Sequence, residues 1–406
     1  MKVRALTGFI DPGWPLNTEP IKSVAACLQA CQEALQEVGI EVQTLRLATP
    51  PPSEMKGPVP PADRADLARK LEAECFAHGV DYGAIGPALP DEPEGYDVIP
   101  EVIAATEIIF TSGIFADPLY GISLPAARAC AQAIHESSTI SPDGFANLRF
   151  AALANVPPGA PFFPAAFHDG GSPAIAVATE AADVAVDAIL NASSIDSARR
   201  HLVVSIEDHA STLSQIAQRI ASKHDHRFLG VDFSLAPFPE EARSIGTAME
   251  AFSLSAAGLS GTAAAATFIA DCLDRAEFSR TGFCGLFLPV LEDSVLAARA
   301  AEGKLTVTHL LLYATLCGTG LDTIPLPGDV TPGAMASLLI DLGALALRHN
   351  KPLTARLMPI PGKVVGDEIH FDFPYFADSR VMNLPAELLE GLLGGSGALD
   401  IGPRLS

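Results

Sequence analysis

The chain has 406 residues, of which 49% are hydrophobic and 18% charged, a composition typical of a folded globular protein. Its formal net charge of −22 disfavours binding to nucleic-acid backbones and to anionic bilayers. The apolar run after Lys2 and Arg4 is too short for a signal peptide, and no apolar run approaches the roughly 20 residues of a membrane span. The sequence therefore predicts a cytoplasmic protein whose partners are small molecules, with no nucleic acid or membrane among them.

Along the chain, short apolar or β-branched segments alternate with longer segments of helical periodicity. Ten segments have the pattern of strands: 3–10, 41–48, 82–89, 108–115, 149–156, 174–180, 228–236, 283–291, 321–328 and 353–360. Three of the segments between them, 19–39, 62–79 and 331–350, are typical of helices, and Pro332 and Asn350 mark the ends of the last. Such alternation predicts parallel strands with helical crossovers, in an open doubly wound sheet or in a closed barrel larger than the eight-stranded kind.

We interpret residues 1–406 as one α/β barrel domain, because no stretch has the composition of a clear domain boundary. Segment 181–226 is long, helical and more polar than its surroundings, and Asn191 to Ser197 interrupts its periodicity. We expect two helices there, forming an inserted or protruding hairpin.

Segment 155–171, NVPPGAPFFPAAFHDGG, combines stiffening prolines, flexible glycines and phenylalanines. We predict that it walls a pocket at the open end of the barrel, with Phe162 and Phe163 excluding water from a bound substrate. His168 is the candidate acid or base in this loop. The alternative is an ordinary surface histidine.

Acidic residues follow several predicted strands, where ligands bind in parallel α/β folds. Glu180, Asp232 and Glu292 are predicted to converge on one rim and to hold a divalent cation such as Mg²⁺, Mn²⁺ or Ca²⁺. Asp232 interrupts an apolar run, so its carboxylate needs a partner. For Asp293 and Asp329, which precede helical segments, capping of a helix N-terminus is the favoured interpretation.

Cationic and glycine-rich positions are candidates for binding an anionic substrate. Arg149 and Arg356 lie inside predicted strands, and each either faces a pocket, where it could hold a carboxylate or phosphate, or faces a helix interface. Gly261 and Thr262 begin a helix whose free N–H groups could bind an anion, although close helix packing explains these small residues equally well. No nucleotide-cofactor motif is present, because this stretch lacks the P-loop lysine and the strand of a dinucleotide fingerprint.

Several long motifs together resemble the DUF711 (UPF0210) family of uncharacterised proteins. They are NLRFAALANVPPGAPFFPAAFHDGG, GVDFSLAPFP, GLSGTAAAA, GLFLPVLEDSVLAARAAEG, GLDTIPLPGD and KPLTARLMPIPGK. The resemblance implies a ten-stranded α/β barrel similar to that of pyruvate formate-lyase and other glycyl radical enzymes. Cys317 matches a cysteine of the family's CxxGLD stretch, but the carboxyl-terminal tail lacks the radical glycine, so we expect no glycyl radical.

Our leading hypothesis is an enzyme that acts on a small polar or anionic metabolite in the barrel mouth. His168, Asp232 and Glu180 would be its catalytic residues, with the divalent cation as a cofactor. The first alternative is a non-catalytic metabolite-binding or regulatory protein that uses the same pocket. The second is a structural homo-oligomer whose acidic residues cap helices.

Overall fold

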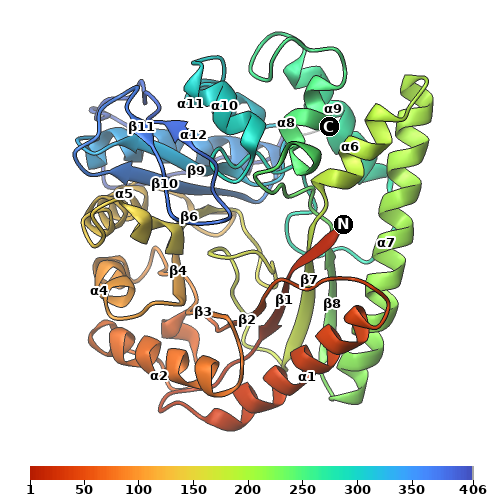
Figure 1. Cartoon of the computed structure of the whole chain (residues 1–406). Helices are drawn as coiled ribbons and strands as arrows, with labels where there is room; N and C mark the ends of the chain where they lie inside the picture. Colours follow the sequence, from red (N-terminus) through yellow and green to blue (C-terminus); the bar gives the residue numbers. More distant parts are fainter. Residues whose placement is uncertain (405–406) are drawn as a thin grey trace.

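The computed structural model describes residues 1–404 and has a mixed α/β fold with one large, mostly parallel sheet (Figure 1). In sheet order, its main strands are β8 (Arg227–Asp232), β7 (Ala174–Glu180), β1 (Lys2–Phe9), β2 (Leu45–Ala48), β3 (Tyr82–Ala84), β4 (Ile109–Asp117), β6 (Phe150–Ala154), β10 (Leu353–Ile360) and β9 (Gly320–Pro327). Short strands β5 (Gly121–Ser123) and β13 (Ala398–Leu399) extend this sheet beside β4, while β11 (Glu368–Ile369) pairs with β12 (Ser379–Arg380).

Helices cover the outer face of the sheet (Figure 1). Their bounds are α1 (Thr18–Gln36), α2 (Arg64–Ala77), α3 (Glu94–Asp97), α4 (Ile99–Ala104), α5 (Leu124–Ser137), α6 (Ala182–Leu190), α7 (Ile195–Lys223), α8 (Ile245–Glu250), α9 (Thr262–Arg275), α10 (Ser294–Ala301), α11 (Val307–Tyr313) and α12 (Pro332–His349). Short 3₁₀ turns lie at Pro52–Glu54, Pro61–Asp63, Phe145–Arg149 and Glu241–Arg243. Within residues 1–404, no helix combines the length and the apolar character needed to cross a membrane.

Each predicted strand except 283–291 overlaps a strand of the sheet. Segment 280–290 instead makes isolated bridges, from Arg280 to Val231 on β8, from Leu286 to Leu235, and from Pro289 to Asp322 on β9. A regular ladder is interrupted here because Cys284 has a φ of 43° and Pro289 has no N–H to donate. The segment thus lies between the two ends of the sheet without forming a regular tenth strand.

The expectation of parallel pairing throughout is wrong at two places. Strands β1, β2, β3, β4 and β6 run parallel to one another, but β7 is antiparallel to β1 and β10 is antiparallel to β6. The connection between β6 and β7 is the cause. It contains no crossover helix and returns to the edge of the sheet that it left, so β7 must run in the opposite direction to β6.

This reversal gives the sheet two edges that we name after the residues paired there. At the Phe9 edge, Phe9 pairs with Ala174, so β1 ends where β7 begins. At the Glu180 edge, Glu180 pairs with Lys2, so β7 ends where β1 begins. The carboxyl ends of strands that run in the direction of β1 and of those that run in the direction of β7 therefore lie at different edges of the sheet.

Side chains alternate between the helices and the inner face of the sheet. On β7, Ile175 and Val177 pack in the core shared with the helices, whereas Ala174, Ala176 and Ala178 belong to clusters on the inner face. These small inner residues leave room for the connection 155–171, which runs between the strands (Figure 1). Thr7 on β1 donates a hydrogen bond to the carbonyl of Pro161 at 2.8 Å and holds the connection inside.

Segment 181–226 forms two helices, α6 and α7, with the break between them where the sequence predicts it. They do not protrude as a separate hairpin. Helix α7 packs against β7, β8 and α1, as expected for the crossover between the parallel strands β7 and β8. The segment is therefore part of the α/β framework.

Candidate functional site

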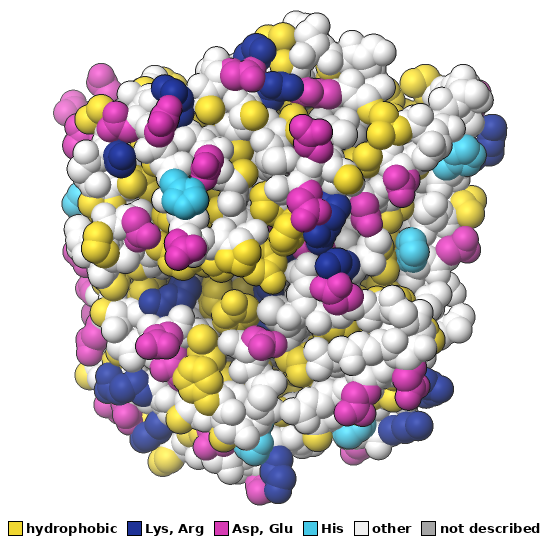
Figure 2. Space-filling model, viewed as in Figure 1, with side chains coloured by type: hydrophobic (Ala, Val, Ile, Leu, Met, Phe, Trp, Pro, Cys, Tyr) yellow, Lys and Arg dark blue, Asp and Glu magenta, His cyan; other side chains and the backbone are white. Residues whose placement is uncertain are grey.

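One cavity opens inside the sheet, toward the Glu180 edge. Its empty space is about 920 Å³, which includes the part open to solvent, and Figure 2 shows a hollow with hydrophobic side chains near the middle of one face. The polar lining residues are Arg4, Gln43, Thr44, Arg46, Glu292, Thr319, Asp322, Thr354 and Arg356. The aromatic ones are Tyr82, Phe110, Phe162, Phe163, Phe283, Phe287, Phe373 and Tyr375. An apolar cavity with a few inward polar groups is the usual form of a small-molecule site.

The connection 155–171 supplies the centre of the apolar wall, as the sequence predicts. The ring of Phe162 packs at a tilt against that of Phe287, with centroids 4.7 Å apart, and Phe163 and Phe110 pack edge to face with centroids 5.3 Å apart. Both phenylalanines are buried and line the cavity. The connection therefore narrows the space inside the sheet to a pocket of ligand size.

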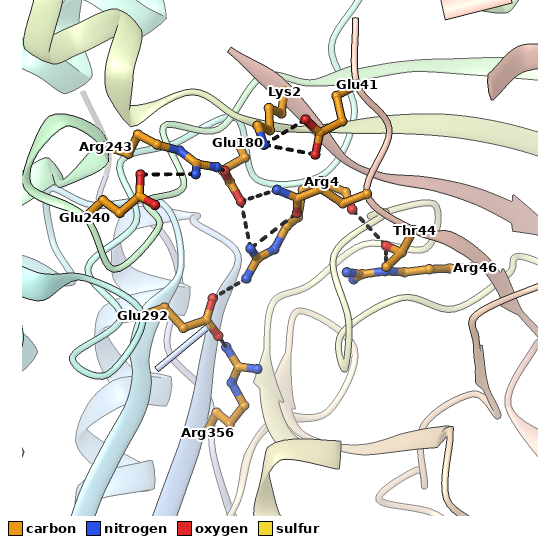
Figure 3. A network of polar contacts seen from close by, with 11 residues as sticks. Lys2, Arg4, Glu41, Thr44, Arg46, Glu180, Glu240, Arg243, Glu292 and Arg356 are labelled. Carbon is orange, nitrogen blue, oxygen red and sulfur yellow. Dashed lines mark hydrogen bonds and ion pairs between the residues drawn. The ribbon is translucent and has the colours of Figure 1, made fainter. Parts of the chain in front are cut away.

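Arginines and carboxylates form a chain of ion pairs along one side of the cavity (Figure 3). Arg4 donates to Glu180 at 2.7 Å and to Glu292 at 2.6 Å. Arg356 binds the other oxygen of Glu292 at 2.6 Å and Asp322 at 2.6 Å, while Arg243 pairs with Glu180 from outside the cavity. Each buried carboxylate of the chain is thus compensated by at least one guanidinium.

The pKa values of this chain reflect burial opposed by ion pairing. Burial favours the neutral form of Glu292, but Arg356 and Arg4 outweigh it and hold its pKa below the ordinary value. For Asp322 burial is the larger influence and raises its pKa, in spite of Arg356. Asp322 is therefore the pocket carboxyl that takes up a proton more readily.

Arg46 on β2 is a buried cation of a different kind. It is 8% exposed, and its Nε donates to the Thr44 hydroxyl at 2.9 Å, but no carboxylate within residues 1–404 pairs with it. Its guanidinium lies 5.2 Å from the ring centre of Phe163 and 5.7 Å from that of Tyr82. Burial, with a further contribution from Arg4, lowers its pKa to about 10, so it stays charged at neutral pH.

His168 does not belong to this cavity. Its backbone N–H binds the carbonyl of Thr49 and its ring lies 6.4 Å from that of Phe9, which places it at the Phe9 edge. The rise along β7 puts about 20 Å between that edge and Glu180. Its ring nitrogens contact the Gly171 carbonyl and Asp169, and burial lowers its pKa. The predicted catalytic group of His168, Asp232 and Glu180 is thus not assembled.

Asp232 instead fixes a loop. It is fully buried and accepts hydrogen bonds from the Ser234 hydroxyl at 2.6 Å and from the backbone N–H groups of Phe283 and Cys284 at 2.7 and 2.8 Å. Burial raises its pKa to about 6, and these hydrogen bonds oppose the rise. Asp232 therefore holds Phe283 in the cavity wall without lining the cavity itself.

This shift predicts a dependence of stability on pH. Because the folded-state pKa of about 6 exceeds the ordinary 3.8, protonation of Asp232 favours folding fully below pH 3.8, and the contribution disappears as the pH rises through 6. The total is on the order of 3 kcal/mol, at about 1.4 kcal/mol per pKa unit. As the pH rises from 4 to 7, urea unfolding should show the wild type losing this stability relative to Asp232→Asn. Parallel curves would contradict the assignment.

The predicted metal site is not formed by its three residues. Glu180 and Glu292 are bound by arginines, and Asp232 by a hydroxyl and two N–H groups. Across the described part of the chain, no three or more histidine, cysteine, aspartate or glutamate side chains form a group that could hold a metal ion. Oxygen atoms already engaged with cations and donors do not provide a ligand set.

Three other predicted substrate-binding residues lie outside the cavity. Arg149 donates to the backbone carbonyls of Ile103, Thr106 and Ile109, and so caps the end of α4. Gly261 is the N-cap residue immediately before α9, with a φ of 104°, and the Thr262 hydroxyl donates to the Leu259 carbonyl. We therefore assign these residues structural roles, whereas Arg356 lines the cavity.

Helix capping is confirmed for Asp293 and wrong for Asp329. The carboxylate of Asp293 accepts from the N–H groups of Val295 and Leu296 at the start of α10. For α12 the cap is Thr331, whose hydroxyl accepts from Ala334. Pro332 occupies the first turn of α12, and Asn350 ends it in the left-handed conformation that the sequence predicts.

The comparison with known proteins agrees with the motifs of the sequence. A family model described as "Uncharacterised ACR (DUF711)" matches residues 1–377. The chain belongs to this family. Relatives named UPF0210 proteins include one from Pyrobaculum islandicum, 31% identical with 83% of this chain and 78% of the relative covered, and one from Methanopyrus kandleri, 30% identical with 86% and 82% covered. Another, from Clostridium perfringens, is 27% identical with 86% and 81% covered.

The DUF711 match includes every residue that lines the cavity, from Arg4 to Tyr375. Sequence reasoning missed Arg4, Arg46 and Asp322 in this cavity. A signal for all three was present, because each is a charged residue within an apolar strand, the criterion that selected Arg356. The same criterion also selected Arg149, so it identifies buried charges without telling which face of the sheet they occupy.

Proposed function

We propose that this protein binds a small organic anion in the cavity and that Arg46 holds the anionic group. The observation that carries the proposal is the absence of a carboxylate partner for Arg46 within the described residues, although its side chain is buried. A buried charge without a counterion is costly, and a ligand that supplies the counterion removes the cost. The ligand-sized cavity and its aromatic walls fit an organic molecule better than a bare inorganic ion.

An enzymatic function requires, in addition, a group that can transfer a proton within reach of the ligand. Among the pocket carboxyls, Asp322 has a pKa that burial raises, and it shares Arg356 with Glu292. In the enzyme hypothesis we therefore assign proton transfer to Asp322 in place of His168, Asp232 and Glu180. In the alternative hypothesis of a sensor, the binding step by Arg46 is the same and Asp322 only balances charge.

We also infer that the sheet closes into a barrel around the cavity through segment 280–290. Support comes from the isolated bridges of this segment, to Val231 and Leu235 on one side and to Asp322 on the other. With the nine strands of the main path, this segment would be the tenth stave. In a closed barrel, the backbone N–H and C=O groups around the ligand would already be hydrogen-bonded between neighbouring strands, so the ligand would contact mainly side chains.

The substitution Arg46→Gln tests the proposal. We expect at least one small anion from a panel of carboxylates and phosphates to raise the melting temperature of the wild type but not of Arg46→Gln. At a ligand concentration of 100 times Kd, binding adds about 2.7 kcal/mol to the free energy of unfolding. Without ligand, the variant should be at least as stable as the wild type, because a buried uncompensated charge has been removed.

The control is Arg69→Gln, which removes the same charge from an exposed position on α2. Chloride at equal ionic strength separates specific binding from screening. An anion response that persists in Arg46→Gln, or a panel with no response in the wild type, would refute the proposal.

A further inference from the structure

The buried charges of the cavity set the charge of its ligand. Three guanidinium groups, Arg4, Arg243 and Arg356, face three carboxylates, Glu180, Glu292 and Asp322, through the ion pairs of Figure 3 and the contact to Asp322. These six charges cancel; Arg243 also lies 3.5 Å from Glu240, but that carboxylate is exposed and water screens its charge, so it is not counted with the buried groups. Arg46 is left as one positive charge without a counterion among the described residues, so one negative charge neutralises the site and two would leave it negative.

The free surface of Arg46 also selects the type of anion. Its Nε is engaged by Thr44, and the rings of Phe163 and Tyr82 lie within 6 Å of the guanidinium. Its terminal nitrogens make no hydrogen bond to any residue in 1–404, and Arg46 is one of the residues that line the cavity. Two neighbouring N–H groups match the two oxygens of a carboxylate. The aromatic rings beside them favour a ligand whose remaining part is apolar and flat.

A second polar group without a partner within residues 1–404, the hydroxyl of Thr319, lies in the cavity wall at a distance from Arg46 in the sheet order. The hydroxyl of Thr319 is buried, lines the cavity and has no hydrogen-bond partner among the described residues. Thr319 immediately precedes β9, and β3, β4, β6 and β10 separate β9 from β2 in the sheet order. Arg46 and Thr319 therefore lie on well-separated parts of the cavity wall, from which they can contact different ends of one molecule. A buried hydroxyl without a partner favours a ligand that provides one.

We propose that the ligand is a monocarboxylate with a flat apolar body and a hydrogen-bonding substituent, such as a hydroxyl, at the end opposite the carboxylate. The carboxylate binds Arg46, the body packs against Phe110, Phe162 and Phe163, and the substituent binds Thr319. This inference rests on the proposed function of Arg46 and adds the charge and shape of the anion.

Four organic probes and inorganic phosphate test it on the full chain by calorimetry and thermal shift. Benzoate and 4-hydroxybenzoate have one charge, phthalate has two, and methyl benzoate has none. We expect both monoanions to bind, 4-hydroxybenzoate about 5 to 10 times more tightly, as one hydrogen bond provides. Phthalate, phosphate and methyl benzoate should bind at least about 10 times more weakly than benzoate.

Two variants separate the contacts. Arg46→Gln should weaken both monoanions about 10-fold or more, and the isosteric Thr319→Val should abolish only the preference for 4-hydroxybenzoate. A melting temperature of ligand-free Thr319→Val that is no lower than that of the wild type shows that the variant folds normally. If phthalate or phosphate binds more tightly than benzoate and depends on Arg46, the monoanion inference fails while the proposed function stands.

Other outcomes are equally decisive. If no probe depends on Arg46, both the inference and the proposed function fail. If 4-hydroxybenzoate has no advantage over benzoate in the wild type, or keeps its advantage in Thr319→Val, the assignment of Thr319 is wrong.

Discussion

Replacing Glu292 with glutamine is expected to lower the free energy of unfolding by about 3 to 5 kcal/mol. Each carboxylate oxygen of Glu292 accepts from a different arginine, Arg4 and Arg356, at 2.6 Å, and the side chain is nearly buried. Glutamine keeps one acceptor and turns its NH₂ group toward the other guanidinium, which leaves an uncompensated cation in the cavity. Urea unfolding of the wild type and Glu292→Gln measures the difference.

Glu302→Gln is the matched control, because it breaks ion pairs with Arg299 and Lys304 at the surface. Solvent screens those pairs, so we expect only a small fraction of the Glu292→Gln effect. Equal effects of the two substitutions would show that the buried chain of ion pairs does not stabilise the fold.

Removing the carboxylate of Asp293 should have an effect of similar size, about 3 to 5 kcal/mol, because it caps two helices at once. One oxygen accepts from Ser244, Val295 and Leu296, at 2.6, 3.0 and 2.9 Å. The other accepts from the N–H groups of Ile245 and Gly246 in α8, at 2.6 and 3.3 Å. Asp293→Ala leaves these buried donors without an acceptor. Urea unfolding would measure the loss of stability, and amide exchange would show whether the first turns of α8 and α10 open more readily.

Two further variants should lose less stability than Asp293→Ala. Asp293→Asn keeps a single acceptor oxygen, so the bonds to α10 are retained and those from Ile245 and Gly246 are lost, while Ser244 still caps α8; we expect an intermediate loss of stability. Thr331→Ala removes an exposed single cap from α12 and should cost about 1 kcal/mol. An Asp293→Ala variant no less stable than Thr331→Ala would contradict the double cap.

The sequence determined what depends on neighbouring residues. Hydrophobic periodicity located strands such as β7 and β10, whose observed bounds match the prediction, and the break between α6 and α7. Proline at the start of α12 and asparagine at its end predicted its limits, because proline fixes φ in the first turn and asparagine tolerates the left-handed conformation that ends a helix. The motif-rich connection 155–171 was predicted to wall a pocket, since few other structures need its mixture of proline, glycine and phenylalanine.

Tertiary structure alone decided which charges meet. Asp232 and Glu292 look alike in the sequence, as acids within or just after apolar runs, yet one fixes a loop and the other lies between two arginines. The reversal of β7 against β1 likewise separates the strand ends into two edges and puts His168 far from Glu180. Strand direction depends on where a connection re-enters the sheet, a long-range property that no local pattern of residues encodes. The role that we propose for Arg46 also depends on tertiary structure. Only the folded sheet shows that the described residues around its buried guanidinium include no carboxylate paired with it.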